Sequence, residues 1–255
     1  MKIPFNKPYI PPGSEELLIE SYLSQIHSGN NYWNSKCIDF LKERFKFSEV
    51  FLVPSCTDAL EMGVLLSGIK PGDEVILPSF TFSSTATAVL LAGAKPVFCE
   101  VEPGTMNMDV NHLRDLITAK TKLIIPIDYS GIPCDINEIN NVALQHNIEV
   151  FIDSAQSLNS RIPTGEFVGN SSSLAAFSFH ETKNFSCGEG GALVVNKNEW
   201  IERAYIMQEK GTDRRKVIDG LKNKYEWIDI GSSYLLSDLL ASVLYSQLQN
   251  IDYIT

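Results

Sequence analysis

Apolar residues along this chain form short unbroken runs and longer segments with a helical period. The short runs have the length and composition of buried strands, and they lie at 50–53, 74–78, 95–101, 122–128, 148–153 and 174–179. Amphipathic segments separate most of these runs, at 57–68, 85–93, 109–117 and 135–147. Strands that alternate with helices at this spacing predict parallel βαβ units. The expected fold class is therefore α/β, with a mostly parallel central sheet covered by helices on both faces.

Further helices are predicted on both sides of this alternating region, at 14–26, 35–45, 197–211 and 237–255. Ser14 is the expected N-cap of the first helix, and Gly211 is the expected C′ residue of the third. We expect three parts in the chain: an N-terminal arm and helix at 1–30, a large domain at 31–235, and the start of a connecting helix at 236–255.

Composition and charge exclude several classes of protein. A net charge of -10 over 255 residues argues against binding to nucleic acid or to an anionic membrane. No apolar run approaches the roughly 18 residues that a membrane span needs. The five cysteines are scattered and never spaced as C-x-x-C, which indicates reduced thiols and a cytoplasmic location. The four histidines are not paired at metal-ligand spacing, so we expect no zinc site.

Ligands of open α/β sheets bind beyond the carboxyl ends of the strands, so residues that follow strands are the functional candidates. Ser55, Thr57 and Asp58 follow the run at 50–53 and begin a helix. Backbone N–H groups and hydroxyls at such a helix start can bind phosphate. The same hydroxyls can simply cap the helix, which is the commoner role for either one taken alone.

A carboxylate and an aromatic ring follow two other predicted strands. Asp153 ends the run at 148–153, and a buried carboxylate there must be hydrogen-bonded, as a turn residue or as part of a site. Phe82 follows the run at 74–78, where it is a core aromatic or a ring that stacks on a planar ligand.

Lys183 follows the run at 174–179 and precedes a glycine-rich segment with Gly188, Gly190 and Gly191. Most lysines are solvated surface charges, but glycines let the backbone approach a ligand closely. A lysine desolvated at this place would have a depressed pKa and could form a Schiff base. His180, just before it, is expected to be a hydrogen-bonded structural residue.

The combination is more informative than any single residue. A helix start suited to phosphate, a strand-end carboxylate, an aromatic ring and a lysine all follow strands of one predicted sheet. Pyridoxal phosphate requires these parts: a lysine for the Schiff base, a carboxylate that keeps the pyridine nitrogen protonated, a phosphate site and a platform for the ring.

Six segments also carry a resemblance to a known family. They read "PSCTDAL", "PSFTFSSTATAV", "IDSAQS", "SFHETKN", "GEGGALVV" and "EKGTDR…KYEWIDIGSSYLLSDLLAS". In this order they resemble the DegT/DnrJ/StrS-type nucleotide-sugar aminotransferases, which are pyridoxal-phosphate enzymes with the aspartate-aminotransferase fold. The resemblance runs the length of the chain.

The resemblance assigns a role to each ring contact. It implies that Lys183 is the catalytic Schiff-base lysine and moves the proton between substrate and cofactor. Asp153 would pair with the pyridinium nitrogen, Gln156 would contact the ring hydroxyl, and Phe82 would stack on the ring. Relatives with histidine at the lysine position act as dehydratases, so Lys183 argues against that branch.

The resemblance also implies phosphate contacts. Thr57, Asp58 and Ser178 would bind the phosphate within one chain. Ser233 occupies the position where many members carry an asparagine that reaches the phosphate of a neighbouring subunit. A homodimer is therefore expected.

Within the family, "FHETKN" and "DIGSSYLLSDL" are most similar to enzymes that move an amino group from L-glutamate to C4 of dTDP-4-dehydro-6-deoxyglucose. The product, dTDP-4-amino-4,6-dideoxygalactose, is a precursor of cell-surface polysaccharide such as lipopolysaccharide or enterobacterial common antigen. Amination at C3, or of a GDP- or UDP-linked sugar, is the alternative within enzymes. Family members continue into a small C-terminal domain that is expected to be missing here, so a non-catalytic cofactor-binding or regulatory remnant is the alternative outside them.

Overall fold

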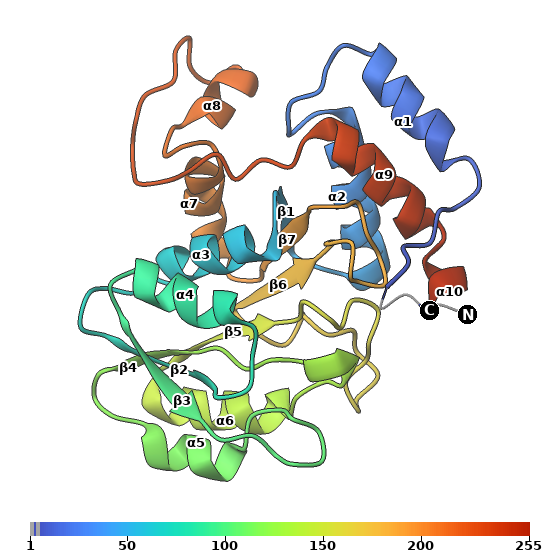
Figure 1. Ribbon diagram of the computed structural model, residues 1–255. Coiled ribbons are helices and arrows are strands. Elements are labelled where there is room, and N and C mark those ends of the chain that lie inside the picture. The colour runs from blue at the N-terminus through green and yellow to red at the C-terminus, as the bar shows by residue number, and fades with distance from the viewer. Residues whose placement is uncertain (1–2, 4–5) are drawn as a thin grey trace.

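A central sheet organises the chain in the computed structural model, which describes Ile3 and residues 6–255 (Figure 1). In the described part this sheet has seven strands in the order β1-β7-β6-β5-β4-β2-β3. The strands are β1 Glu49–Val53, β2 Glu74–Pro78, β3 Lys95–Cys99, β4 Thr121–Ile124, β5 Glu149–Asp153, β6 Leu174–Ser178 and β7 Gly191–Val195. The pairs β2–β3, β2–β4, β4–β5 and β5–β6 are parallel, which confirms the predicted class.

Strand β7 was not predicted, and it runs antiparallel between β1 and β6. Its residues, Gly191–Val195, are completely buried, yet they follow directly on the glycine-rich segment and were assigned to it. The connection from β6 to β7 contains no helix, and a parallel neighbour would need a crossover. The polypeptide between these two strands therefore forms a loop at one end of the sheet, and that loop carries Lys183.

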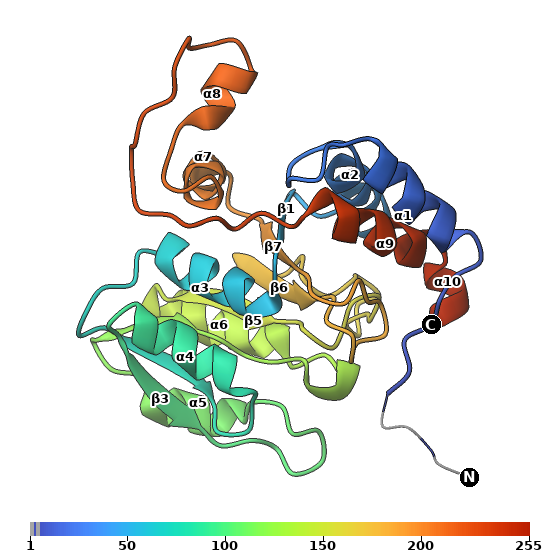
Figure 2. The same ribbon diagram turned by 45° about the horizontal axis from the view of Figure 1, so that its top comes forward.

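Helices cover both faces of the sheet (Figures 1 and 2). One face packs against α3 Cys56–Leu66, α4 Ser83–Leu91 and α7 Asn198–Gln208. The other packs against α2 Tyr32–Phe45, α5 Val110–Leu116, α6 Ile136–His146 and α9 Asp238–Gln249. Successive strand residues alternate between the two hydrophobic clusters: Phe151 belongs to the first, and Val150 and Ile152 belong to the second. This confirms a sheet buried on both sides.

The two ends of the described chain pack together. Helix α1, Ser14–Leu23, and helix α2 both lie against α9 (Figure 2). The buried Asp238 carboxylate at the start of α9 accepts hydrogen bonds from Trp33 N (3.1 Å), Asn34 N (2.9 Å) and Asn34 Nδ2 (2.9 Å). These bonds fix the first turn of α2 against the first turn of α9. The remaining short helices are η1 Tyr129–Gly131, α8 Arg214–Ile218 and α10 Ile251–Ile254.

Two helix ends lie at other residues than those predicted. Ser14 is the first helical residue of α1 and not its N-cap, because Gly13 occupies that position with φ 81°, and the Ser14 hydroxyl donates to Pro11 O (2.8 Å). Gly211 is not the C′ residue of α7, because the helix ends at Gln208 with Glu209 as its C-cap, which makes Lys210 (φ 64°) the C′ residue; Gly211, at φ 76°, is the next residue along the chain. Among the residues described, no helix combines the length and the apolar character that a membrane crossing needs.

Candidate active site

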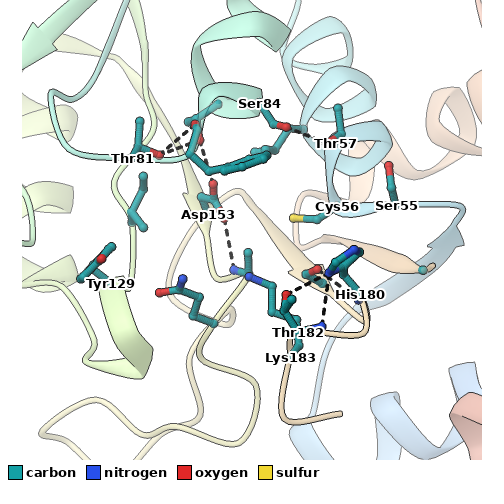
Figure 3. A pocket seen from close by; sticks show the side chains of 18 of the residues that line it. Ser55, Cys56, Thr57, Thr81, Ser84, Tyr129, Asp153, His180, Thr182 and Lys183 are labelled. Atoms are coloured by element: carbon teal, nitrogen blue, oxygen red, sulfur yellow. Dashed lines mark hydrogen bonds between the residues drawn. The ribbon is translucent and has the colours of Figure 1, made fainter. Parts of the chain in front are cut away.

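A cavity of about 360 Å³ opens at the carboxyl ends of β1, β2, β5 and β6 (Figure 3). This is the edge at which an open α/β sheet binds ligands. Six of the predicted site residues line it: Thr57, Phe82, Asp153, Gln156, Ser178 and Lys183. They lie at or just after the ends of these four strands, and the fold brings them to one place.

Asp153 ends strand β5 and lies at the floor of the cavity with 5% of its surface exposed. Its Oδ2 accepts a hydrogen bond from Thr85 Oγ1 (3.0 Å), and its Oδ1 accepts one from Ala155 N (3.1 Å). Burial raises the pKa of the Asp153 carboxyl, although these bonds and the charge of Lys183 act in the opposite direction. Both hydrogen-bond partners are neutral, so a cation placed beside this carboxylate would be strongly stabilised.

Lys183 lies in the loop between β6 and β7. The loop is held at its base, where Glu181 N donates to Gly188 O (2.9 Å) and Lys183 N donates to His180 O (2.9 Å). The lysine is partly buried, and its side chain points across the cavity toward Asp153 (Figure 3). Its charge lowers the pKa of both Asp153 and the Cys56 thiol, although burial raises each of these two pKa values more strongly. The structure therefore brings the predicted amine and carboxylate together.

Two helix starts meet at one wall of the cavity. Ser55 caps α3, because its Oγ accepts a hydrogen bond from Asp58 N (3.0 Å). Thr57 in the first turn of α3 and Ser84 in the first turn of α4 face each other, with 2.7 Å between their hydroxyl oxygens. Two helix N-termini and their hydroxyls are suited to an anion. The cap of α3 therefore uses Ser55, and the Thr57 hydroxyl is not part of it.

The structure does not place Asp58 and Ser233 among the cavity-lining residues. The Asp58 carboxylate accepts a hydrogen bond from Ser55 Oγ (2.7 Å), so it is engaged in the cap of α3. Ser233 is exposed and lies beside Glu209 in an isolated antiparallel bridge. A direct contact from either residue to the phosphate stays a prediction.

Of the three glycines after Lys183, Gly191 allows a close approach within the protein itself. A Cβ on Gly191 would lie 2.5 Å from Cys56 N and from the Ser55 carbonyl carbon. Gly191 therefore lets β7 pack against the start of α3, and the close approach is between two backbones. Gly188 adopts φ 92°, which fits the turn before β7, and Gly190 is the member of the group that lines the cavity.

Sequence patterns did not identify several cavity residues. Thr85 was assigned only to a helix, although it is completely buried and binds Asp153. The available signal was that Thr85 is a polar residue on the otherwise apolar, buried side of a helix. Gln156 was predicted, but its partner was not: its Oε1 accepts a hydrogen bond from Ser130 N (2.6 Å). Other lining residues that were missed are Cys56, Thr81, Ser84, Tyr129, Thr182 and Glu189.

His180 is hydrogen-bonded, as expected. Its Nδ1 lies 2.9 Å from Thr182 Oγ1, and its Nε2 lies 3.6 Å from Glu189 Oε1. Within the described residues, His, Cys, Asp and Glu side chains do not gather in a group of three that could hold a metal ion.

Comparison with known proteins agrees with this geometry. The model of the DegT/DnrJ/EryC1/StrS aminotransferase family matches residues 35–255. The chain belongs to this family. The aminotransferases of the family depend on pyridoxal phosphate.

The relatives that the chain matches are longer than the chain. It is 33% identical to the uncharacterized protein MJ1066 of Methanocaldococcus jannaschii over 201 aligned residues. The aligned segment covers 78% of this chain and 52% of MJ1066. The chain thus spans about half the length of this curated relative.

Solved structures match nearly the whole chain. The proposed sugar aminotransferase Spr1654 from Streptococcus pneumoniae superposes in its apo form with a TM-score of 0.90 at 26% identity, covering 99% of this chain and 67% of that one. The aminotransferase TlmJ from Streptoalloteichus hindustanus gives a TM-score of 0.90 at 27% identity, with coverage of 99% and 67%. Spr1654 has also been solved in PLP and PMP forms.

Proposed function

We propose that the cavity binds pyridoxal phosphate and that Lys183 is the residue that forms its Schiff base. The observation that carries this proposal is the buried Asp153 carboxylate, which has only neutral hydrogen-bond partners and faces the Lys183 side chain. A protonated pyridine nitrogen would place a cation directly against this carboxylate. The bound cofactor supplies an electron sink for the carbon from which a proton is removed.

The other cavity residues fit the rest of the group. Phe82 is 77% exposed, and an aromatic ring bound over it would cover this apolar surface and stack on it. The Gln156 Oε1 is engaged with the Ser130 N–H, which leaves its Nε2 to donate to the ring hydroxyl oxygen. Thr57 at the start of α3 and Ser178 at the end of β6 carry hydroxyls for the phosphate, and Ser84 at the start of α4 extends that set.

The residues of this chain would then divide the work of transamination. Asp153 would hold the proton on the ring nitrogen, because its buried charge favours a neighbouring cation. The Lys183 amine, once free, would take the proton from the substrate carbon and return it to the cofactor carbon. The walls formed by Phe82 and the two helix starts would exclude water on that side.

The proposed substrates are a nucleotide-linked keto sugar and L-glutamate. The family assignment and the likeness to Spr1654 support the sugar class. The particular reaction proposed is amination at C4 of dTDP-4-dehydro-6-deoxyglucose to dTDP-4-amino-4,6-dideoxygalactose, supported by the motifs around Lys183 and Ser233. In a homodimer, the exposed Ser233 would reach the phosphate of the neighbouring site.

Replacement of Lys183 tests the cofactor assignment. The purified protein should show the visible absorbance of bound pyridoxal phosphate, and borohydride reduction should fix the cofactor on a peptide that contains Lys183. Lys183→Ala should lose both signals, whereas Lys122→Ala, at an exposed lysine on β4, should keep them. Cofactor fixed with equal yield in the Lys183→Ala variant would contradict the assignment.

A panel of substrates tests the rest of the proposal. dTDP-, UDP- and GDP-linked 4-keto and 3-keto sugars should be incubated with the protein and glutamate, and the products analysed by mass spectrometry and NMR. We expect amination of dTDP-4-dehydro-6-deoxyglucose at C4. Selective amination of another sugar would change the substrate and leave the cofactor site intact.

A further inference from the structure

Asp128 is a second buried carboxylate, and the proposed reaction gives it no role. Its side chain is completely buried. Its Oδ2 accepts hydrogen bonds from Ser154 Oγ (2.8 Å) and Ser157 Oγ (2.8 Å), and its Oδ1 accepts one from Cys134 N (2.9 Å). A buried anion that takes three neutral donors is costly to maintain, so its position calls for an explanation.

The backbone places Asp128 directly behind the cavity. Ile127 pairs with Asp153 in a parallel bridge just beyond β4, and Asp128 N donates to Asp153 O (3.1 Å). Successive side chains of an extended segment point to opposite faces. Ile127 and Asp153 both line the cavity. The residues after them, Asp128 and Ser154, therefore meet on the opposite face, where the hydrogen bond between their side chains joins the two strand ends.

The same carboxylate holds the turn that follows β5. Ser157 N donates to Ser154 O (3.1 Å), which closes a turn over residues 154–157, and both serine hydroxyls bind Asp128. The two residues between them, Ala155 and Gln156, face the cavity. The Ala155 N–H is one of the two groups that hold the Asp153 carboxylate.

We propose that Asp128 is a positioning residue of the cofactor site: it fastens the 154–157 turn to the end of β4 and so fixes Asp153 and Gln156 against the ring from behind the sheet. This inference rests on the proposed function of the cavity. Asp128 also places a second carboxylate near Asp153 and raises the pKa of the Asp153 carboxyl, so a cation at the ring nitrogen beside Asp153 would interact with both carboxylates. Its charge acts in the same direction as that of Asp153, because both stabilise a cation there.

Asp128→Asn separates the charge from the shape of the side chain. Three quantities are measured for the wild type and for the variant: the Kd for pyridoxal phosphate, the pH midpoint of the absorbance change of the bound cofactor, and the melting temperature of the apoprotein. We expect Asp128→Asn to bind cofactor at least about tenfold more weakly. We also expect the pH midpoint to fall by roughly half a unit or more, since a nearby anion that favours the protonated cofactor is gone.

Two variants serve as controls. Ser154→Ala keeps the Asp128 charge and removes one of its donors, so it should weaken cofactor binding and leave the pH midpoint in place. Asp135→Asn makes the same charge change at the exposed N-cap of α6, where asparagine also caps, and it should leave all three quantities unchanged.

The outcomes are distinct. A melting temperature that falls in Asp128→Asn while Kd and pH midpoint stay at wild-type values would mean that Asp128 only stabilises the fold, and would overturn the inference. If that variant does not fold, unchanged cofactor binding by Ser154→Ala overturns it in the same way. Wild-type protein that fails to bind pyridoxal phosphate overturns the proposed function as well.

Discussion

Replacing Gly191 by alanine should damage the candidate phosphate site without removing any group that would bind a ligand. Gly191 is the first residue of β7, and its φ lies outside the left-handed region, so alanine is compatible with its backbone. The added Cβ would lie 2.5 Å from both Cys56 N and the Ser55 carbonyl carbon, and 2.6 Å from Ser55 O. All three are backbone atoms at the start of α3.

The size of the effect follows from these distances. Ordinary contact begins at 3.4 Å, so β7 and the start of α3 would have to separate by about 0.9 Å. Overpacking of a close-packed core costs about 1–3 kcal/mol, and two regular backbone elements have little freedom to yield. We expect a loss of about 3 kcal/mol in the free energy of unfolding. The displaced helix start should weaken pyridoxal phosphate binding about tenfold or more.

Urea denaturation of the apoprotein and an absorbance titration with pyridoxal phosphate measure the two effects. Gly104→Ala is the matched control, because a Cβ there meets no atom within 4 Å and its φ is also outside the left-handed region. It should stay within about 0.5 kcal/mol of wild type. If Gly191→Ala were as stable as this control and bound cofactor as tightly as wild type, the close approach of β7 to α3 would be irrelevant to the site.

Three further predictions concern single side chains. Asp238→Ala should lower the free energy of unfolding by about 3 kcal/mol in urea, because it leaves the buried donors of Trp33 and Asn34 without an acceptor; equal stability would argue against that link between α2 and α9. Phe82→Ala should weaken cofactor binding about two- to tenfold in the absorbance titration without lowering the melting temperature, since the ring is 77% exposed. Asp153→Asn should stabilise the apoprotein at neutral pH while weakening cofactor binding, because it removes a carboxylate whose pKa is raised by burial. That gain should disappear in melting curves as the pH falls through the raised pKa and then below the ordinary value, where the wild-type carboxyl is protonated in both the folded and the unfolded state.

Much of the candidate site could be predicted because its residues lie at strand ends or shortly after them. Asp153, Thr57 and Lys183 each follow a recognisable apolar run, and an α/β sheet brings such positions to one edge. The position of each residue relative to its own strand was sufficient to place it at the cavity.

The contacts that support these residues could not be predicted in the same way. Thr85 and Asp153 are 68 residues apart, and Asp128 and Ser154 are 26 apart, so no local pattern connects them. Asp128 and Ser154 meet because β4 and β5 are neighbouring strands, whereas Thr85 of α4, which follows β2, reaches Asp153 although β4 lies between β2 and β5. A threonine in a helix and an aspartate after a strand look ordinary in the sequence.

The sequence by itself determined the order of six of the seven described strands along the chain, the two-sided burial of the sheet and the residue type at each strand end. These features follow from hydrophobic periodicity and from short-range turn and cap chemistry, which act over a few residues. Only the tertiary structure decided that β7 lies antiparallel between β1 and β6, that Gly191 accommodates the backbone of α3, and that Asp128 is buried behind Asp153. Those features depend on which elements become neighbours, and that is set by the packing of the whole sheet.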